Sequence, residues 1–141
     1  MGQHDDDLID VWGRMRALVL RKDMRNEVAE QLGLSFAKAR ALRRLLTRPL
    51  VMRKLAEKLS TDKPYATLIV DQLEELGLVT RTISPEDRRR RIVTLTETGR
   101  AAAERAQEIL TRPPAALVAL PAEDIAEMRR ILGAIPPEEL Q

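Results

Sequence analysis

The densest run of positive charge in the sequence consists of Arg88, Arg89, Arg90 and Arg91. Consecutive cations repel one another, and an adjacent polyanion would remove that cost. The run ends a loop, 84–91, that is longer than the two-residue turn that closes a hairpin most tightly, so the extra length calls for a use. We expect Asp87 to position a neighbouring arginine, because no second carboxylate at a suitable spacing supports catalysis. The alternative is a solvated hairpin tip whose charge only aids solubility.

The positive charge is concentrated in the middle of the chain. The 141 residues carry 24 Lys and Arg against 22 Asp and Glu, a formal net charge of +2. From Ser35 to Arg91, 14 Lys and Arg stand against 7 Asp and Glu, a net +7, while the remaining residues carry 10 against 15, a net −5. A basic middle between acidic ends indicates one face built for a polyanion.

The composition excludes most classes of reactive site. There is no Cys, which excludes disulfides, thiolate nucleophiles and zinc sites of the cysteine type. The single His4 lies in a polar N-terminal arm, so one chain cannot assemble a histidine metal cluster. The sequence also lacks a phosphate-binding glycine loop. We therefore expect no metal, no cofactor and no enzymatic activity.

The same sequence argues against membrane insertion and secretion. Its apolar runs are only a few residues long, far short of the roughly 20 residues of a membrane span. The start, MGQHDDDLID, is acidic where a signal peptide is basic. We therefore expect a cytoplasmic protein without a membrane partner.

The spacing of apolar residues predicts a mainly α chain with a small β-hairpin. Helical periodicity covers 8–32 and ends at Gly33, and Ser35 is expected to cap a second helix that Pro49 breaks. Further helices are predicted at 50–59, 62–76, 97–112 and 122–135. The β-branched stretches 79–83 and 92–95 predict the two strands of a hairpin around the basic loop.

These elements predict a winged helix-turn-helix lobe over 35–96. The turn between its helices 50–59 and 62–76 is only a few residues long, which suits a steep crossing with the second helix free to lie across a major groove of double-stranded DNA. The helix 8–32 is too long and too apolar on one face for a small lobe to cover. We therefore expect a homodimer held by helical regions at 1–34 and 97–141.

Candidate DNA contacts lie on the exposed face of helix 62–76 and on the helix before it. They are Arg53, Lys54, Lys63, Tyr65, Thr67, Leu68 and Gln72. Lys63 stands near a helix N-terminus and suits phosphate. Thr67 can hydrogen-bond a base edge and Leu68 can contact a thymine methyl group. The alternatives are that Leu68 packs inward or supports Tyr65, and that Tyr65 stacks on the neighbouring helix.

Four motifs, in this order along the chain, resemble those of a known family, and the match is good over residues 50–105. They are Leu55-Ala56-Glu57-Lys58-Leu59, Leu73-Glu74-Glu75-Leu76-Gly77-Leu78-Val79-Thr80-Arg81, Pro85-Glu86-Asp87-Arg88-Arg89 and Val93-Thr94-Leu95-Thr96-Glu97-Thr98-Gly99. At this spacing they resemble the MarR (multiple antibiotic resistance regulator) family of bacterial transcription factors. The resemblance implies a homodimer with interlocking terminal helices, repression at a palindromic operator, release by a small ligand, and a wing that reaches the minor groove. Leu68 and Tyr65 depart from the family pattern, so base specificity does not transfer.

The resemblance also implies an effector pocket between the dimer helices and the lobe. Trp12, Met15, Phe36 and Arg40 would fall there, in a mainly aliphatic pocket whose arginine holds an aromatic or apolar anion. The alternative for Trp12, Met15 and Phe36 is the core or the dimer interface. For the whole chain, the competing function is a winged-helix protein–protein interaction module whose basic face binds an acidic partner.

Overall fold

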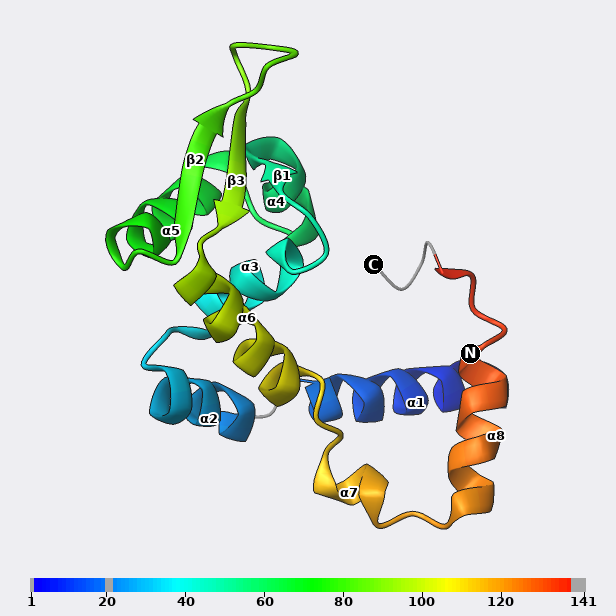
Figure 1. The fold of residues 1–141 in the computed structure, drawn as a ribbon. Helices are drawn as coiled ribbons and strands as arrows, with labels where there is room; N and C mark the ends of the chain where they lie inside the picture. Colours follow the sequence, from blue (N-terminus) through cyan, green and yellow to red (C-terminus); the bar gives the residue numbers. More distant parts are fainter. Residues whose placement is uncertain (1, 20–21, 138–141) are drawn as a thin grey trace. The chain divides into compact units, whose positions relative to one another are not determined.

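The computed structural model describes residues 2–19 and 22–137 (Figure 1). Contacts divide the chain into two compact units, 1–111 and 112–141. The first unit contains α1 (Gln3–Val19), α2 (Lys22–Leu32), α3 (Phe36–Leu45), β1 (Leu50–Val51), α4 (Met52–Lys58), α5 (Lys63–Glu75), β2 (Val79–Ile83), β3 (Arg91–Leu95) and α6 (Glu97–Leu110). The second unit contains α7 (Ala115–Val118) and α8 (Ala122–Leu132). The chain is thus mainly helical with one small sheet, as the sequence predicts.

The sheet has three antiparallel strands in the order β1-β3-β2. The hairpin β2–β3 projects beyond the helices of its unit as the wing (Figure 1), with Val79 opposite Leu95 and Ile83 opposite Arg91. The predicted hairpin is therefore confirmed, but a third strand was not predicted, and the predicted helix start at residue 50 is wrong. Leu50 and Val51 pair with β3, and α4 begins only at Met52.

The core of the lobe lies between α3, α4, α5 and the sheet. Its largest fully buried side chains come from all of these elements: Leu42, Leu45, Leu55, Val70, Leu73, Val79 and Val93. Ala103 of α6 belongs to the same cluster, so the packing of the lobe extends past residue 96. A second, smaller cluster joins α2, α3 and α6 through Val28, Ala39, Ala106 and Ile109.

Side chains at the N-terminal ends define where the helices begin. Asp62 Oδ1 accepts a hydrogen bond from the Tyr65 amide at 2.8 Å, and Pro64 occupies the first turn of α5, where its missing N–H is not needed. Ser35 Oγ likewise accepts from the Lys38 amide at 3.3 Å and caps α3. These caps place α5 within one residue of the predicted 62–76 at each end.

The terminal helices differ from the prediction in their bounds. The predicted helix 8–32 appears as α1, which begins at Gln3, and α2; residues 20–21 lie outside the described residues. The helix predicted at 122–135 ends at Leu132, and α7 was not predicted. Neither α1 nor α8 contains a buried residue. Most of their apolar side chains are exposed, Trp12 to 59%.

The turn at Leu76–Leu78 joins α5, the wing and α6 in one place. Gly77 adopts φ +73°, a left-handed conformation that favours glycine, and its carbonyl accepts the Thr96 hydroxyl at 2.6 Å. The Leu78 carbonyl accepts the Thr96 amide at 3.1 Å. Gly99, in the first turn of α6, lies so close that a Cβ there would overlap this same carbonyl. The first wing strand and α5 are therefore held at one fixed junction.

Replacing Gly99 with Ala is expected to destabilise the lobe by about 2–3 kcal/mol, because the new methyl group meets backbone that cannot move aside. Gly13→Ala is the control, since nothing lies within 4 Å of its Cβ. It should be neutral or more stable by roughly 0.5–1 kcal/mol, as expected for Ala in a helix. Urea unfolding at one protein concentration measures both variants. Equal stability of the two would contradict the close approach at Gly99.

Candidate nucleic-acid interface

One side of α5 is buried and the opposite side is open. Ala66, Ile69, Val70 and Leu73 face the core. The same geometry leaves Tyr65 48% exposed and Leu68 49% exposed, and Gln72 is half-buried. Leu68 therefore does not pack inward. Its apolar side chain lies at the surface of α5.

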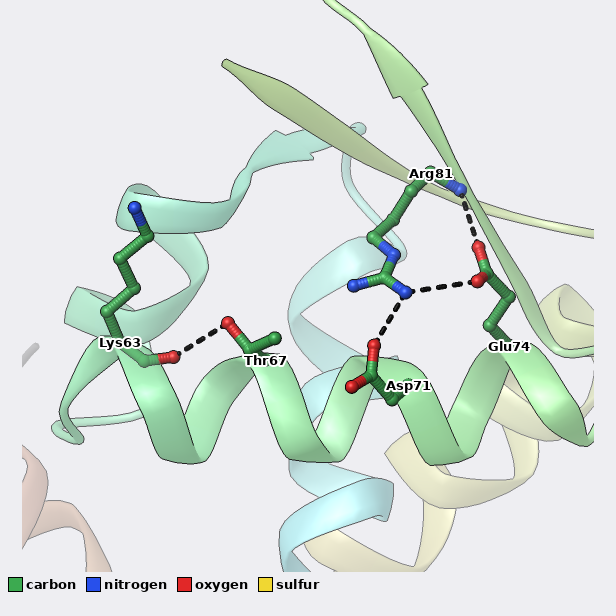
Figure 2. A network of polar contacts seen from close by, with 5 residues as sticks. All are labelled: Lys63, Thr67, Asp71, Glu74 and Arg81. Carbon is green, nitrogen blue, oxygen red and sulfur yellow. Dashed lines mark hydrogen bonds and ion pairs between the residues drawn. The ribbon is translucent and has the colours of Figure 1, made fainter. Parts of the chain in front are cut away.

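The Thr67 side chain is engaged within α5. Its Oγ1 donates a hydrogen bond to the Lys63 carbonyl at 2.9 Å (Figure 2). A hydroxyl has one hydrogen and two lone pairs, so in this state Thr67 can accept a further hydrogen bond but not donate one. This restricts which base edge Thr67 can contact.

Cations from three separate segments surround one hollow of about 260 Å³. It lies between the start of α4, the start of α5 and the wing. Its lining consists of Val51, Met52, Arg53, Lys63, Asp87, Arg89, Arg90 and Arg91. The fold thus brings together six of the candidate residues from sequence, five of which are cations. An anion in this hollow would meet positive charge from all three segments.

The tip of the wing is an ordered turn. Its base is closed by a hydrogen bond from the Ser84 amide to the Arg90 carbonyl at 3.0 Å. Asp87 Oδ1 accepts from the Arg89 amide at 3.0 Å, and the other carboxylate oxygen lies 3.5 Å from Arg90 Nε. Asp87 therefore fixes both the backbone of the tip and one arginine side chain.

The remaining candidate cations are exposed. Arg88 lies at the wing tip, where its carbonyl accepts from Arg91 Nη1 at 3.2 Å. Lys54 Nζ lies 3.4 Å from Glu57, and Arg53 Nε lies 4.0 Å from the same residue. Both pairs are solvent-exposed, so they contribute little stability and leave the two cations available to a partner.

Arg81 on β2 binds two carboxylates of α5 (Figure 2). Its Nη2 lies 2.5 Å from Asp71 Oδ1 and 3.1 Å from Glu74 Oε1, and its amide donates to Glu74 Oε2 at 3.2 Å. The hydrogen bond to Glu74 is the main cause that raises the pKa of Arg81, and Asp71 raises it further. The Arg81 side chain is only 25% exposed. It ties the wing to α5 and neutralises acidic groups beside the candidate interface.

Sequence reasoning did not identify Arg81 as a functional residue. The sequence pattern that could have indicated it is a cation in a predicted strand. That strand follows a helix with carboxylates in its last turns. Which carboxylates it would reach depends on how the strand crosses the helix, and the spacing along the chain does not give that crossing.

The residues predicted for an effector pocket are only partly brought together. Arg40 lies 5.9 Å from the centre of the Phe36 ring, and Arg25 stacks over the same ring at 4.8 Å. Trp12 and Met15 lie on α1, which contains no buried residue. The pocket therefore stays a prediction.

The described residues offer neither a metal-binding cluster nor a helix suited to a membrane. In the part of the chain that the structure describes, no group of three or more His, Cys, Asp or Glu is placed to hold a metal ion. No helix within 2–19 and 22–137 is long and apolar enough to cross a membrane.

Comparisons with known proteins agree with this geometry. Residues 34–90 match the model of the MarR family. The organic hydroperoxide resistance transcriptional regulator of Bacillus subtilis (strain 168) is 29% identical over 86 residues, which are 61% of this chain and 56% of that relative. The aligned part thus spans just over half of the relative's length.

Solved structures share the fold over most of the chain. Wild-type MarR of E. coli in its apo form is 26% identical with a TM-score of 0.72, covering 88% of this chain and 96% of that one. The transcriptional repressor CouR, bound to a 23-mer DNA duplex, is 29% identical with a TM-score of 0.69, covering 95% and 94%. Over residues 34–90 the chain thus matches the MarR family, and its winged-helix fold is similar to those of MarR-family transcriptional regulators.

Proposed function

We propose that this chain is a dimeric transcriptional regulator that binds a palindromic DNA operator and acts as a repressor. The observation that carries the proposal is the hollow in which Arg53, Lys63 and the wing arginines meet. Cations held together in this way repel one another, and DNA phosphates lower that repulsion on binding. The similarity to CouR, whose structure contains a DNA duplex, supports the same partner.

In this proposal the contacts to the DNA backbone come from the starts of α4 and α5 and from the wing. Lys63, at the start of α5, binds phosphate. Arg88 and Arg89 at the wing tip reach the minor groove, where no full base code is available. These contacts position the lobe on DNA without selecting its sequence.

We propose that side chains on the exposed side of α5 contact the bases and select the DNA sequence. Leu68 is exposed and apolar, so it suits a thymine methyl group. Because the Thr67 hydrogen is donated to Lys63, its oxygen can accept only from an amino group, which adenine and cytosine present in the major groove. Tyr65 and Gln72 flank these two positions and are proposed to contact the neighbouring bases.

The dimer is proposed from the uncovered faces of the terminal helices. Leu8, Ile9 and Trp12 on α1 are each at least 59% exposed, and α8 also buries nothing. A second copy would cover such faces and would present two copies of α5 about 34 Å apart, one turn of DNA. We further propose that a small aromatic or anionic effector releases the DNA by favouring a spacing of the lobes that does not fit the operator.

The wing tests DNA binding directly. Arg88→Ala combined with Arg89→Ala is expected to weaken binding to all duplex sequences, because these contacts carry no base information. The slope of log affinity against log salt should fall by about 2, roughly one for each arginine that no longer neutralises a phosphate. Fluorescence anisotropy with labelled duplexes at several salt concentrations measures both quantities.

The control is Arg14→Ala combined with Arg16→Ala on α1, which removes the same charge outside the lobe and should leave the slope unchanged. A wild-type protein whose DNA affinity has no salt dependence would contradict the proposal. That result would favour the competing function, in which the basic face binds an acidic protein.

Arg81 provides a second test, of charge neutralisation. Arg81→Gln leaves Asp71 and Glu74 unpaired beside the DNA, and the resulting repulsion is expected to weaken binding by about tenfold. Adding Asp71→Asn and Glu74→Gln removes the repulsion and should restore most of the affinity. If the triple variant binds no better than the single variant while both stay folded by circular dichroism, the neutralising role of Arg81 is wrong.

The oligomeric state tests the dimer. Sedimentation equilibrium at micromolar concentration is expected to give twice the chain mass of 16.0 kDa. Ile9→Glu with Trp12→Glu should shift the protein toward monomer, because the introduced carboxylates would be buried without partners. Arg14→Glu, on an exposed side chain of the same helix, is the control. A folded wild-type monomer at this concentration would refute the dimer.

A further inference from the structure

The lobe contains a second basic hollow, with a lining distinct from that of the hollow beside the wing. It has a volume of about 230 Å³ and is formed by the end of α3, the loop to β1, the end of α4 and one residue of α6. Its lining consists of Arg43, Arg44, Thr47, Arg48, Leu50, Lys58 and Gln107. None of these residues lines the hollow beside the wing. The two hollows are separate sites.

The charge of this second hollow is not compensated by the protein. Four of its seven lining residues are cations and none is a carboxylate. Within the described residues, no ion pair involves Arg43, Arg44, Arg48 or Lys58. Burial, and then the neighbouring Arg44 guanidinium, lower the pKa of Arg43, which means that the surroundings disfavour its positive charge.

The hollow also holds its donors in place. Arg43 Nε donates to Gln107 Oε1 at 2.7 Å, which orients the plane of the guanidinium. Among the described residues, its two terminal nitrogens make no further hydrogen bond. A guanidinium held in this way can form two parallel hydrogen bonds to a carboxylate or phosphate. The negative end of a helix dipole favours a single cation near a helix C-terminus. It does not explain why four cations line one cavity beside an oriented guanidinium.

We propose that this hollow binds a small polyanion, a ligand with at least two carboxylate or phosphate groups. The volume is below the roughly 300–1,000 Å³ of pockets for drug-sized ligands, so the ligand is compact. The site differs from the predicted effector pocket around Trp12, Met15, Phe36 and Arg40, and it takes a different class of ligand. Its existence does not depend on DNA binding.

Calorimetric titration of the full chain at constant ionic strength tests the proposal. Citrate and pyrophosphate are the probes for the two chemistries, and acetate is the monovalent control. We expect saturable binding of citrate, of pyrophosphate or of both, and none of acetate. The tighter of the two probes identifies the charged group of the ligand. Failure of both probes to bind the wild-type protein would overturn the proposal, whatever the protein does with DNA.

Two matched variants locate the binding. Arg44→Gln with Arg48→Gln removes two cations from the hollow and is expected to weaken binding of the probe at least tenfold. Arg88→Gln with Arg89→Gln removes two cations from the wing and should leave it unchanged, with circular dichroism confirming that both variants fold. Equal binding by both variants, or loss in the wing variant alone, would refute this location.

A DNA titration of the same pocket variant separates a small ligand from the DNA backbone. The salt slope of DNA binding is expected to match that of the wild-type protein. A lowered slope would assign Arg44 and Arg48 to DNA phosphates and would overturn the small-ligand proposal.

Discussion

The close contact of the Leu76–Leu78 turn with the start of α6 is the constraint on which the rest of the lobe depends. The Thr96 side chain and amide bind the carbonyls of Gly77 and Leu78, and Gly99 leaves room for this approach. The helix α5 ends at this turn, the first wing strand begins there, and the second wing strand ends beside it. One junction therefore fixes the direction of both elements that are proposed to contact DNA.

A second connection between the wing and α5 is electrostatic. Arg81 binds Asp71 and Glu74, so α5 and the wing meet without uncompensated carboxylates between them. Beyond Arg81 the wing is basic, and its tip is shaped by Asp87. The net charge of the chain is close to zero, but its lobe presents positive charge on ordered elements. This arrangement favours a polyanionic partner over a role in solubility alone.

Sequence reasoning predicted what depends on local patterns. The apolar spacing placed α5 to within one residue at each end, and the β-branched residues placed both wing strands. It missed β1, because Leu50 and Val51 are defined by pairing with Ile92 and Val93, far along the chain. Spacing alone likewise gave no reason to single out Arg81, whose partners are set by the crossing of a strand over a helix. The second basic hollow was missed for the same reason, since its cations come from separate elements.

The proposed function requires that the start of α5 and the wing form one DNA-binding surface. Hydrogen exchange of backbone amides, measured with and without a duplex selected from random DNA, tests it most directly. We expect DNA to slow exchange in residues 63–68 and 84–91 together and to leave exchange in α8 unchanged. Protection of only one of these segments, or protection confined to the terminal helices, would contradict the claim.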